Sequence, residues 1–353
     1  MRALRHSLFT FFLLLTAMSF CFGGAWLWLG FGCLGIAAVT LDVFLPDDLS
    51  SHAQSSPRLM NTYLYLTLPL VYLNVFAFNW QMSPVDFLGI GAFAQNYGID
   101  IFGAKLGRSI VESIGAYMSI GLLISASGTV AAHELVHRVW DKNSVIMGRW
   151  LLAQSLDTSF SIGHVYGHHA NVAMEDDPAS ARKGEGFWAF FPRSVWGSNR
   201  EAWQIEKKRI EKRHGAATWS VHNVFLRGQV MSLCVAGFYG VAQGAFGILS
   251  FIIVASTAKL YLELINYIEH YGLSRKKGEP ISAQHSWNCN APFSLYCLYN
   301  LPRHPHHHGK GHLPFWKLEA NPGGPTLPFG YMTMILIALV PPFFKKLMDP
   351  RIP

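Results

Sequence analysis

Charged residues are scarce in this sequence. They make up 14% of its 353 positions and hydrophobic residues make up 51%, whereas charged residues form about 25% of an ordinary soluble domain. That balance excludes an ordinary soluble domain and is typical of a chain with several membrane spans. The formal net charge is +7. However, the basic residues lie in one segment between apolar runs and do not form a face interleaved with aromatic residues, so we expect no nucleic-acid partner.

Cysteine pairs and domain linkers are also missing. None of the five cysteines forms a CxxC motif, and three of them, Cys21, Cys33 and Cys234, lie inside apolar runs. This pattern excludes a disulfide framework and an iron–sulfur centre within the chain. Because no internal repeat, low-complexity tract or linker interrupts the sequence, we predict one domain over residues 1–353.

Long apolar runs are abundant. They predict an all-α integral membrane bundle of about six transmembrane helices, at approximately 8–24, 25–45, 59–80, 109–132, 228–244 and 245–265. The first run is too long for a cleaved signal peptide, and we expect it to turn near Gly23 and Gly24. The segment 327–344 contains three prolines, so a seventh crossing, a re-entrant helix and a surface helix all remain open for it.

The positive charges predict the orientation. Thirteen Lys and Arg lie in the stretch 133–227, whereas the loop 81–108 has only Lys105 and Arg108. Basic loops remain on the cytoplasmic side of a membrane. With six spans, the segments 133–227 and 266–326 would therefore both be cytoplasmic, most simply in a bacterial inner membrane.

Histidines gather in these two segments and at their borders. They occur in HELVH, HVYGHH, NYIEHYG and RHPHHH, and an i, i+4 spacing puts two imidazoles on one helical face. Nine residues are candidate metal ligands: His133, His137, His164, His168, His169, His270, His304, His307 and His308. One metal takes four to six ligands, so nine histidines indicate two ions. Dioxygen and one-electron chemistry favours iron or copper over zinc.

The HELVH motif has another interpretation. It is an HExxH sequence, in which two histidines hold zinc and Glu134 would act as the general base of a membrane protease. That mechanism needs only one further ligand, and it leaves the other histidine clusters without a role.

The spacing of these motifs resembles the alkane 1-monooxygenase and xylene monooxygenase family, membrane relatives of the fatty-acid desaturases. The matching blocks are HELVHR (133–138), GHVYGHHANVAMEDDPASAR (163–182), NYIEHYGL (266–273), QHSWN (284–288) and LPRHPHHH (301–308). The resemblance implies a non-haem di-iron centre held by the nine histidines, at the mouth of a hydrophobic channel. It also implies dioxygen as co-substrate, and electrons from a rubredoxin or ferredoxin with its NAD(P)H reductase. Zinc could replace iron in purified protein.

The substrate stays open at this point. Gly163 stands where alkane hydroxylases usually have a glutamate, and HELVHR is nearer to the xylene type. The resemblance implies hydroxylation of a terminal or methyl C–H in an alkane-like molecule. Aromatic-methyl oxidation and decarboxylation of fatty acids to terminal alkenes are the alternatives.

Acidic and polar residues near the histidine clusters could support the ligands. Metal-bound histidines normally donate their second ring nitrogen to a carboxylate or carbonyl group. The candidates by position are Glu134, Glu269, Asp157 and His285, with Asp176 and Asp177 in the second block.

Overall fold

The computed structural model describes residues 2–51, 54–215, 217–320 and 323–353. These residues are helical and include no strand, although Asn288 and Thr326 form an isolated bridge. The α-helices are α1 (Ser7–Phe22), α2 (Leu29–Phe44), α3 (Pro57–Met82), α4 (Ile90–Gln95), α5 (Ile101–Leu106), α6 (Ile110–Leu123), α7 (Val130–Val136), α8 (Lys142–Ala153), α9 (Phe160–Gly163), α10 (His169–Asn171), α11 (Phe187–His214), α12 (Val224–Gln243), α13 (Ala245–His270), α14 (Pro292–Cys297), α15 (His304–Gly309), α16 (Tyr331–Ala338) and α17 (Pro341–Met348).

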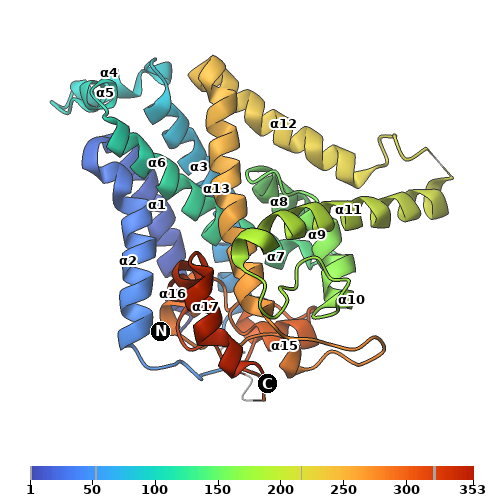
Figure 1. Cartoon of the computed structure of the whole chain (residues 1–353). Coiled ribbons are helices and arrows are strands. Elements are labelled where there is room, and N and C mark those ends of the chain that lie inside the picture. The colour runs from blue at the N-terminus through green and yellow to red at the C-terminus, as the bar shows by residue number, and fades with distance from the viewer. Residues whose placement is uncertain (1, 52–53, 216, 321–322) are drawn as a thin grey trace.

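Six helical segments are long and apolar enough to cross a membrane, which confirms the predicted number. They are Leu4–Phe22, Gly24–Phe44, Pro57–Met82, Ile110–Val136, Val224–Gln243 and Ala245–His270. In Figure 1, α13 runs through the middle of this bundle, and α6 crosses it. The protein is therefore an all-α integral membrane protein.

Glycines with positive φ make the two tight turns between adjacent spans. Gly23 has φ 71° and separates the first two spans, as the sequence predicts, and Gly244 has φ 69° between α12 and α13. A side chain at either position would be strained in this left-handed conformation. At the start of α6, Ser109 and Glu112 form a capping box, which satisfies free backbone amides.

Buried polar side chains join the spans. Asn74 on α3 donates to the Leu13 carbonyl of α1 at 2.9 Å, and Gln243 donates to Asn79 Oδ1 at 2.8 Å. In a bilayer, where apolar surfaces are not driven together by water, such contacts and close packing hold helices in place.

The fourth span is not a regular α-helix. Between α6 and α7 lies a π-helical segment, Ile124–Thr129, and the run continues to Val136. His133 therefore lies within the last turns of this span, whereas the sequence predicts that it lies just beyond the span. His270 is likewise the last residue of α13 and not a residue past its end. The candidate ligands therefore begin inside the membrane helices themselves.

The apolar segment 327–344 does not form a seventh long helix in the described part of the chain. It contains α16 and the start of α17, two eight-residue helices that break at Leu339 and Val340. Each is far shorter than the roughly 20 residues needed to cross a bilayer.

The two chain ends lie at the same end of the bundle as α15, whereas α4 and α5 lie at the opposite end (Figure 1). This arrangement agrees with an even number of crossings. It also puts the histidine-rich α15 on the same side as both termini.

Candidate metal centre

The nine histidines singled out by their motifs lie together in two groups. The first contains His133, His137, His164, His169 and His307, and the second contains His168, His270, His304 and His308. Within each group the potential ligand atoms all lie within 4.8 Å of one another. The histidines come from α7, α10, α13, α15 and a π-helical segment at 164–168. The fold thus converts four separate sequence motifs into two compact imidazole clusters.

The π-helical segment His164–His168 decides which histidines share a group. Sequence spacing suggests that His164 and His168 lie on one face, but they belong to different groups. In a π turn the residues five positions apart come into line. His164 and His169 accordingly lie together, with their Nε2 atoms 3.1 Å apart.

Three short contacts show how the imidazoles converge. The Nε2 atom of His307 lies 3.0 Å from Nε2 of His169, and the Nε2 atom of His304 lies 3.0 Å from Nε2 of His308 and 3.1 Å from Nε2 of His270. In the described part of the chain, the Nε2 atoms of His133, His137 and His168 are buried without a hydrogen-bond partner. A metal ion in each group would satisfy these nitrogens, because the potential ligand atoms of a group lie close together.

Burial keeps these imidazoles neutral. It lowers the pKa of His137 to about 3, with a further contribution from the charge of His168. Burial also lowers the pKa of His164, His169 and His307 well below the usual value. A neutral imidazole is the form that binds a metal.

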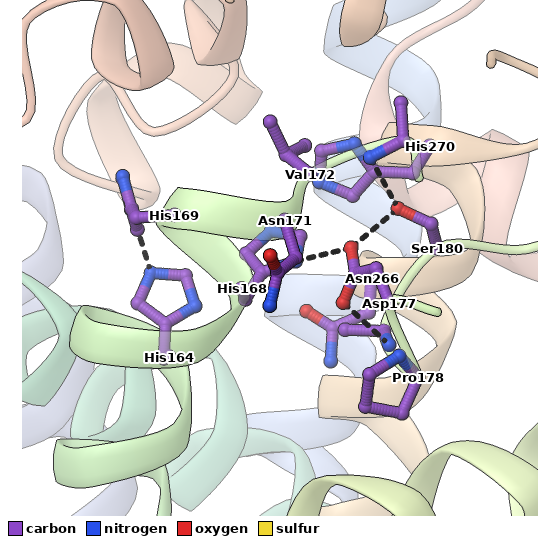
Figure 2. A network of polar contacts seen from close by, with 12 residues as sticks. His164, His168, His169, Asn171, Val172, Asp177, Pro178, Ser180, Asn266 and His270 are labelled. Atoms are coloured by element: carbon purple, nitrogen blue, oxygen red, sulfur yellow. Dashed lines mark hydrogen bonds and ion pairs between the residues drawn. The ribbon is translucent and has the colours of Figure 1, made fainter. Parts of the chain in front are cut away.

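Two histidines are oriented through their second ring nitrogen. Nδ1 of His168 lies 2.8 Å from Asp177 Oδ2, and Ser180 donates to the same carboxylate oxygen at 2.6 Å (Figure 2). Nδ1 of His270 donates to the His285 carbonyl at 3.2 Å. Both contacts leave Nε2 free to face its group, as is usual for histidines that hold a metal.

The other supporting candidates lie in different places. Asp157 forms an ion pair with Lys259 at 2.8 Å, and among the described residues its carboxylate makes no hydrogen bond or ion pair with a histidine. Glu134 forms an ion pair with Arg138 at 2.9 Å. Glu269 has one oxygen 3.3 Å from His304 Nε2 and accepts a hydrogen bond from Tyr331 through the other, at 2.9 Å.

His285 contacts the site through its backbone and not through its ring, which faces Ser282 and Glu279. Two further residues of this region, Lys259 and Tyr331, were not predicted from the sequence. A charged residue inside an apolar span is a signal that could have revealed Lys259. Nothing in the sequence pattern marks Tyr331.

An apolar pocket lies between the spans. It is lined by Leu34, Ala38, Leu122, Ser125, Ala126, Tyr261, Ile265, Phe293, Ser294, Cys297, Leu298, Tyr331, Met332 and Ile335. Ile265 also lines a second, smaller pocket that contacts His133, His164 and His304. The apolar pocket therefore lies next to a pocket that contacts both histidine groups, with Ile265 in the wall of each.

Two polar pockets reach the same histidines from other directions. One lies beside His137 and is lined in part by Arg138, Trp140 and Trp316. The other lies beneath α11 and contacts His164 and His168. The histidine groups thus face lipid-like surroundings on one side and polar surroundings on the others.

Comparisons with known proteins agree with this geometry. The family model described as fatty acid desaturase matches residues 113–335. Alkane 1-monooxygenase 1 of Pseudomonas aeruginosa is 33% identical over 307 residues, which cover 84% of this chain and 75% of the relative. The chain belongs to the alkane monooxygenase family.

Two further relatives define the range of this family. An alkane 1-monooxygenase of Acinetobacter baylyi is 38% identical over 69% of this chain and 60% of its own length. The hydroxylase component of a xylene/toluene monooxygenase from Pseudomonas putida is 27% identical over 95% of this chain and 85% of its own length. This alkane monooxygenase family member is therefore a membrane-bound oxidoreductase. Its histidine clusters are suited to non-haem iron.

Proposed function

We propose that this protein is a di-iron monooxygenase that hydroxylates a terminal or methyl C–H bond of an alkane-like molecule with dioxygen. The observation that carries the proposal is that Ile265 lines both an apolar pocket between the spans and a neighbouring pocket that touches both histidine groups. A hydrophobic chain held there would present its end to the metal centre. Such a site binds by shape and exclusion of water.

The two histidine groups would each hold one iron. The group of five and the group of four match the four to six ligands that one ion takes. When bound, the ions supply the redox chemistry that activates dioxygen. Neutral imidazoles also suit zinc, so zinc is the expected contaminant in protein purified without added iron.

The chain's own residues then have three tasks. The apolar lining orients the substrate and excludes water. Asp177 and the His285 carbonyl hold His168 and His270 in the tautomer that leaves Nε2 free. The pair of Glu269 and Tyr331 lies between the channel and the second histidine group, where it joins α13 to α16.

The site favours hydroxylation over the alternatives. The linings of the two neighbouring pockets contain no Lys or Arg that would bind the carboxylate of a fatty acid, so decarboxylation is not favoured. A zinc protease would need Glu134 as a free base, but Arg138 holds that carboxylate in an ion pair. The protease mechanism would also leave most of the nine histidines unused.

Electrons would come from a separate rubredoxin or ferredoxin and its reductase. The five cysteines are free and scattered, so no electron-transfer centre is expected within this chain. The polar pocket beside His137 would be the place where the donor approaches, because Lys142, Lys310 and Lys317 adjoin its lining residues in sequence. By the distribution of positive charge, that side would be the cytoplasm.

The test uses membranes that contain this protein, a rubredoxin, its reductase and NADH under labelled dioxygen. Octane, xylene and dodecanoic acid are supplied separately, and products are identified by mass spectrometry. We expect labelled 1-octanol and loss of activity in His307→Ala, with activity retained in His222→Ala, a control at an exposed histidine. Undecene from dodecanoic acid, or peptide cleavage without oxygen, would contradict the proposal.

A further inference from the structure

The polar pocket beneath α11 has a composition unlike the rest of the membrane-facing site. Four carboxylates and one ammonium group line it, together with serine and asparagine side chains; they are Asp157, Asp177, Glu201, Glu263 and Lys259. The pocket contacts His164, from the first histidine group, and His168, from the second. It therefore touches both histidine groups and shares no lining residue with the apolar pocket.

The inner wall of this pocket is a continuous set of hydrogen bonds. Lys259 Nζ lies 2.8 Å from Asp157 Oδ2 and 2.9 Å from Glu263 Oε1. Glu263 in turn accepts a hydrogen bond from Asn266 at 3.3 Å. Asn266 lines both this pocket and the pocket that contains His133 and His304. The polar contacts thus extend from Asp157 to the edge of the reaction site.

The outer wall belongs to α11, where Ser198 and Glu201 are partly exposed. Gly163 also lines the pocket, and a Cβ atom there would lie 3.3 Å from the Ser198 carbonyl. Because this position has no side chain, α9 can approach α11 closely at this wall of the pocket. A pocket with this many polar partners meets the condition for holding water.

We propose that this pocket is a water-filled inlet for the protons that hydroxylation consumes, and that Asp157 passes them inward. The inference rests on the proposed function. In that reaction one substrate C–H, one dioxygen, two electrons and two protons give one alcohol and one water. The electrons come from the external donor, and the protons must come from water through one of the two polar pockets that contact the histidines.

Asp157 is better suited to this task than its neighbours. Glu263 is engaged by Lys259, by Ser194 at 2.6 Å and by Asn266. Asp157 has Lys259 as its one close partner, since the Ser159 hydroxyl lies 3.4 Å away. Burial raises the pKa of Asp157 above the usual range, which brings the carboxyl closer to the pH at which it can both take and release a proton.

The second polar pocket is less suited to carry protons. It is lined by two carboxylates, and one of them, Glu134, forms an ion pair with Arg138 at 2.9 Å. A guanidinium group cannot release a proton at physiological pH. The pocket beneath α11 has instead four carboxylates, and its one cation is a lysine.

The first test compares Asp157→Asn with Asp157→Glu and with Glu211→Gln, an exposed control at the far end of α11. Metal content and thermal stability are measured together with single-turnover rates in H₂O and D₂O. We expect Asp157→Asn to keep its metal, to react about tenfold or more slowly and to show a larger solvent isotope effect. Asp157→Glu should recover part of the rate. An unchanged rate and isotope effect in Asp157→Asn would overturn the proposal, as would loss of the metal.

The second test does not depend on turnover. Ser198→Cys at the mouth and Ser159→Cys inside the pocket are treated with a charged thiol reagent, in metal-free and metal-loaded membranes. Leu233→Cys, on the exposed surface of α12, is the control within a span. We expect both pocket cysteines to react and the control to stay unlabelled. An unreactive cysteine at 159 would show a dry pocket and overturn the inlet, even in a protein whose catalytic assay had failed.

Discussion

At the scale of single residues, the contact between Asp177 and His168 makes a direct prediction. The carboxylate is buried and fixes the imidazole through Nδ1 at 2.8 Å. Replacing Asp177 with Asn should therefore weaken metal binding about 10–100-fold, as loss of such a partner usually does. Chelator competition followed by metal analysis measures the effect. Asp176→Asn, at the exposed neighbouring carboxylate, should bind metal like the wild type, and equal losses in both variants would contradict the role of Asp177.

This pair also shows what sequence can and cannot resolve for single residues. The motif places Asp176 and Asp177 equally near the histidines, and only the backbone turn decides that Asp177 points inward. Likewise, the clusters in the sequence were enough to predict all nine histidines as candidate ligands, and the fold brings these nine together. Their division into five and four could not, because it depends on a π turn that shifts the helical period.

A second residue, Lys105, predicts a dependence on pH. It is buried in α5, donates to the Val85 carbonyl at 2.7 Å and lies 4.3 Å from the ring centre of Trp80. Burial lowers its pKa from 10.5 to about 8; Asp86 acts in the opposite direction and Arg108 in the same one. At pH values between these two pKa values, the unfolded chain binds more protons at this site than the folded chain does. The folded protein therefore becomes more stable as the pH rises.

The wild type should therefore become more stable relative to Lys105→Met as the pH rises from about 8 to about 10. Below this pH range the folded protein buries the charged ammonium group of Lys105, which lowers its stability. Above this range the amine is neutral in the folded and the unfolded protein, so this cost is absent. Melting temperatures in detergent, measured for both proteins across the range, test this. Lys142→Met, at an exposed lysine, should show no such trend, and a constant difference between wild type and Lys105→Met would count against the argument.

At the scale of helices, the close approach of α6 and α13 should position the histidines at the ends of the fourth and sixth spans. A Cβ atom on Gly121 would lie 2.5 Å from Thr257 Cγ2, so a larger residue must push these helices apart. Gly121→Leu should destabilise the protein by about 1–3 kcal/mol and reduce its metal content. Gly237→Leu, on α12 where nothing lies within 4 Å, is the matched control. Thermal unfolding and metal analysis should separate the two variants, and similar behaviour would show that this approach does not set the site.

The number of spans could be predicted from hydropathy because a crossing helix needs a fixed length of apolar chain. Their ends could not be predicted as well. The sequence suggests that the fourth span ends at 132, but the helix continues through His133 to Val136. The run of apolar residues ends at 132. The helix continues beyond it because other parts of the protein bury the histidines that follow.

At the scale of the whole molecule, the site faces two different surroundings. The apolar pocket between α2, α13 and α16 lies next to a pocket that contacts both histidine groups, and two polar pockets contact other faces of the histidines. In the proposed reaction, this arrangement would let a substrate dissolved in lipid meet electrons and protons supplied from water. It depends on contacts among helices that are far apart in sequence, and so it could not be read from the motifs.

The length of the apolar pocket should therefore control the length of the substrate. Ala38, on α2, is buried in its lining, and Ala38→Phe would fill that part of the pocket without touching a histidine. Activity on dodecane should fall about tenfold or more relative to activity on hexane, because only the longer chain needs the filled space. Competition between the two alkanes, with products quantified by mass spectrometry, gives the ratio of kcat/KM directly. Ile36→Phe, on the exposed surface of the same helix, should leave that ratio unchanged. If Ala38→Phe slowed both alkanes equally, the chain of the substrate would have to lie elsewhere.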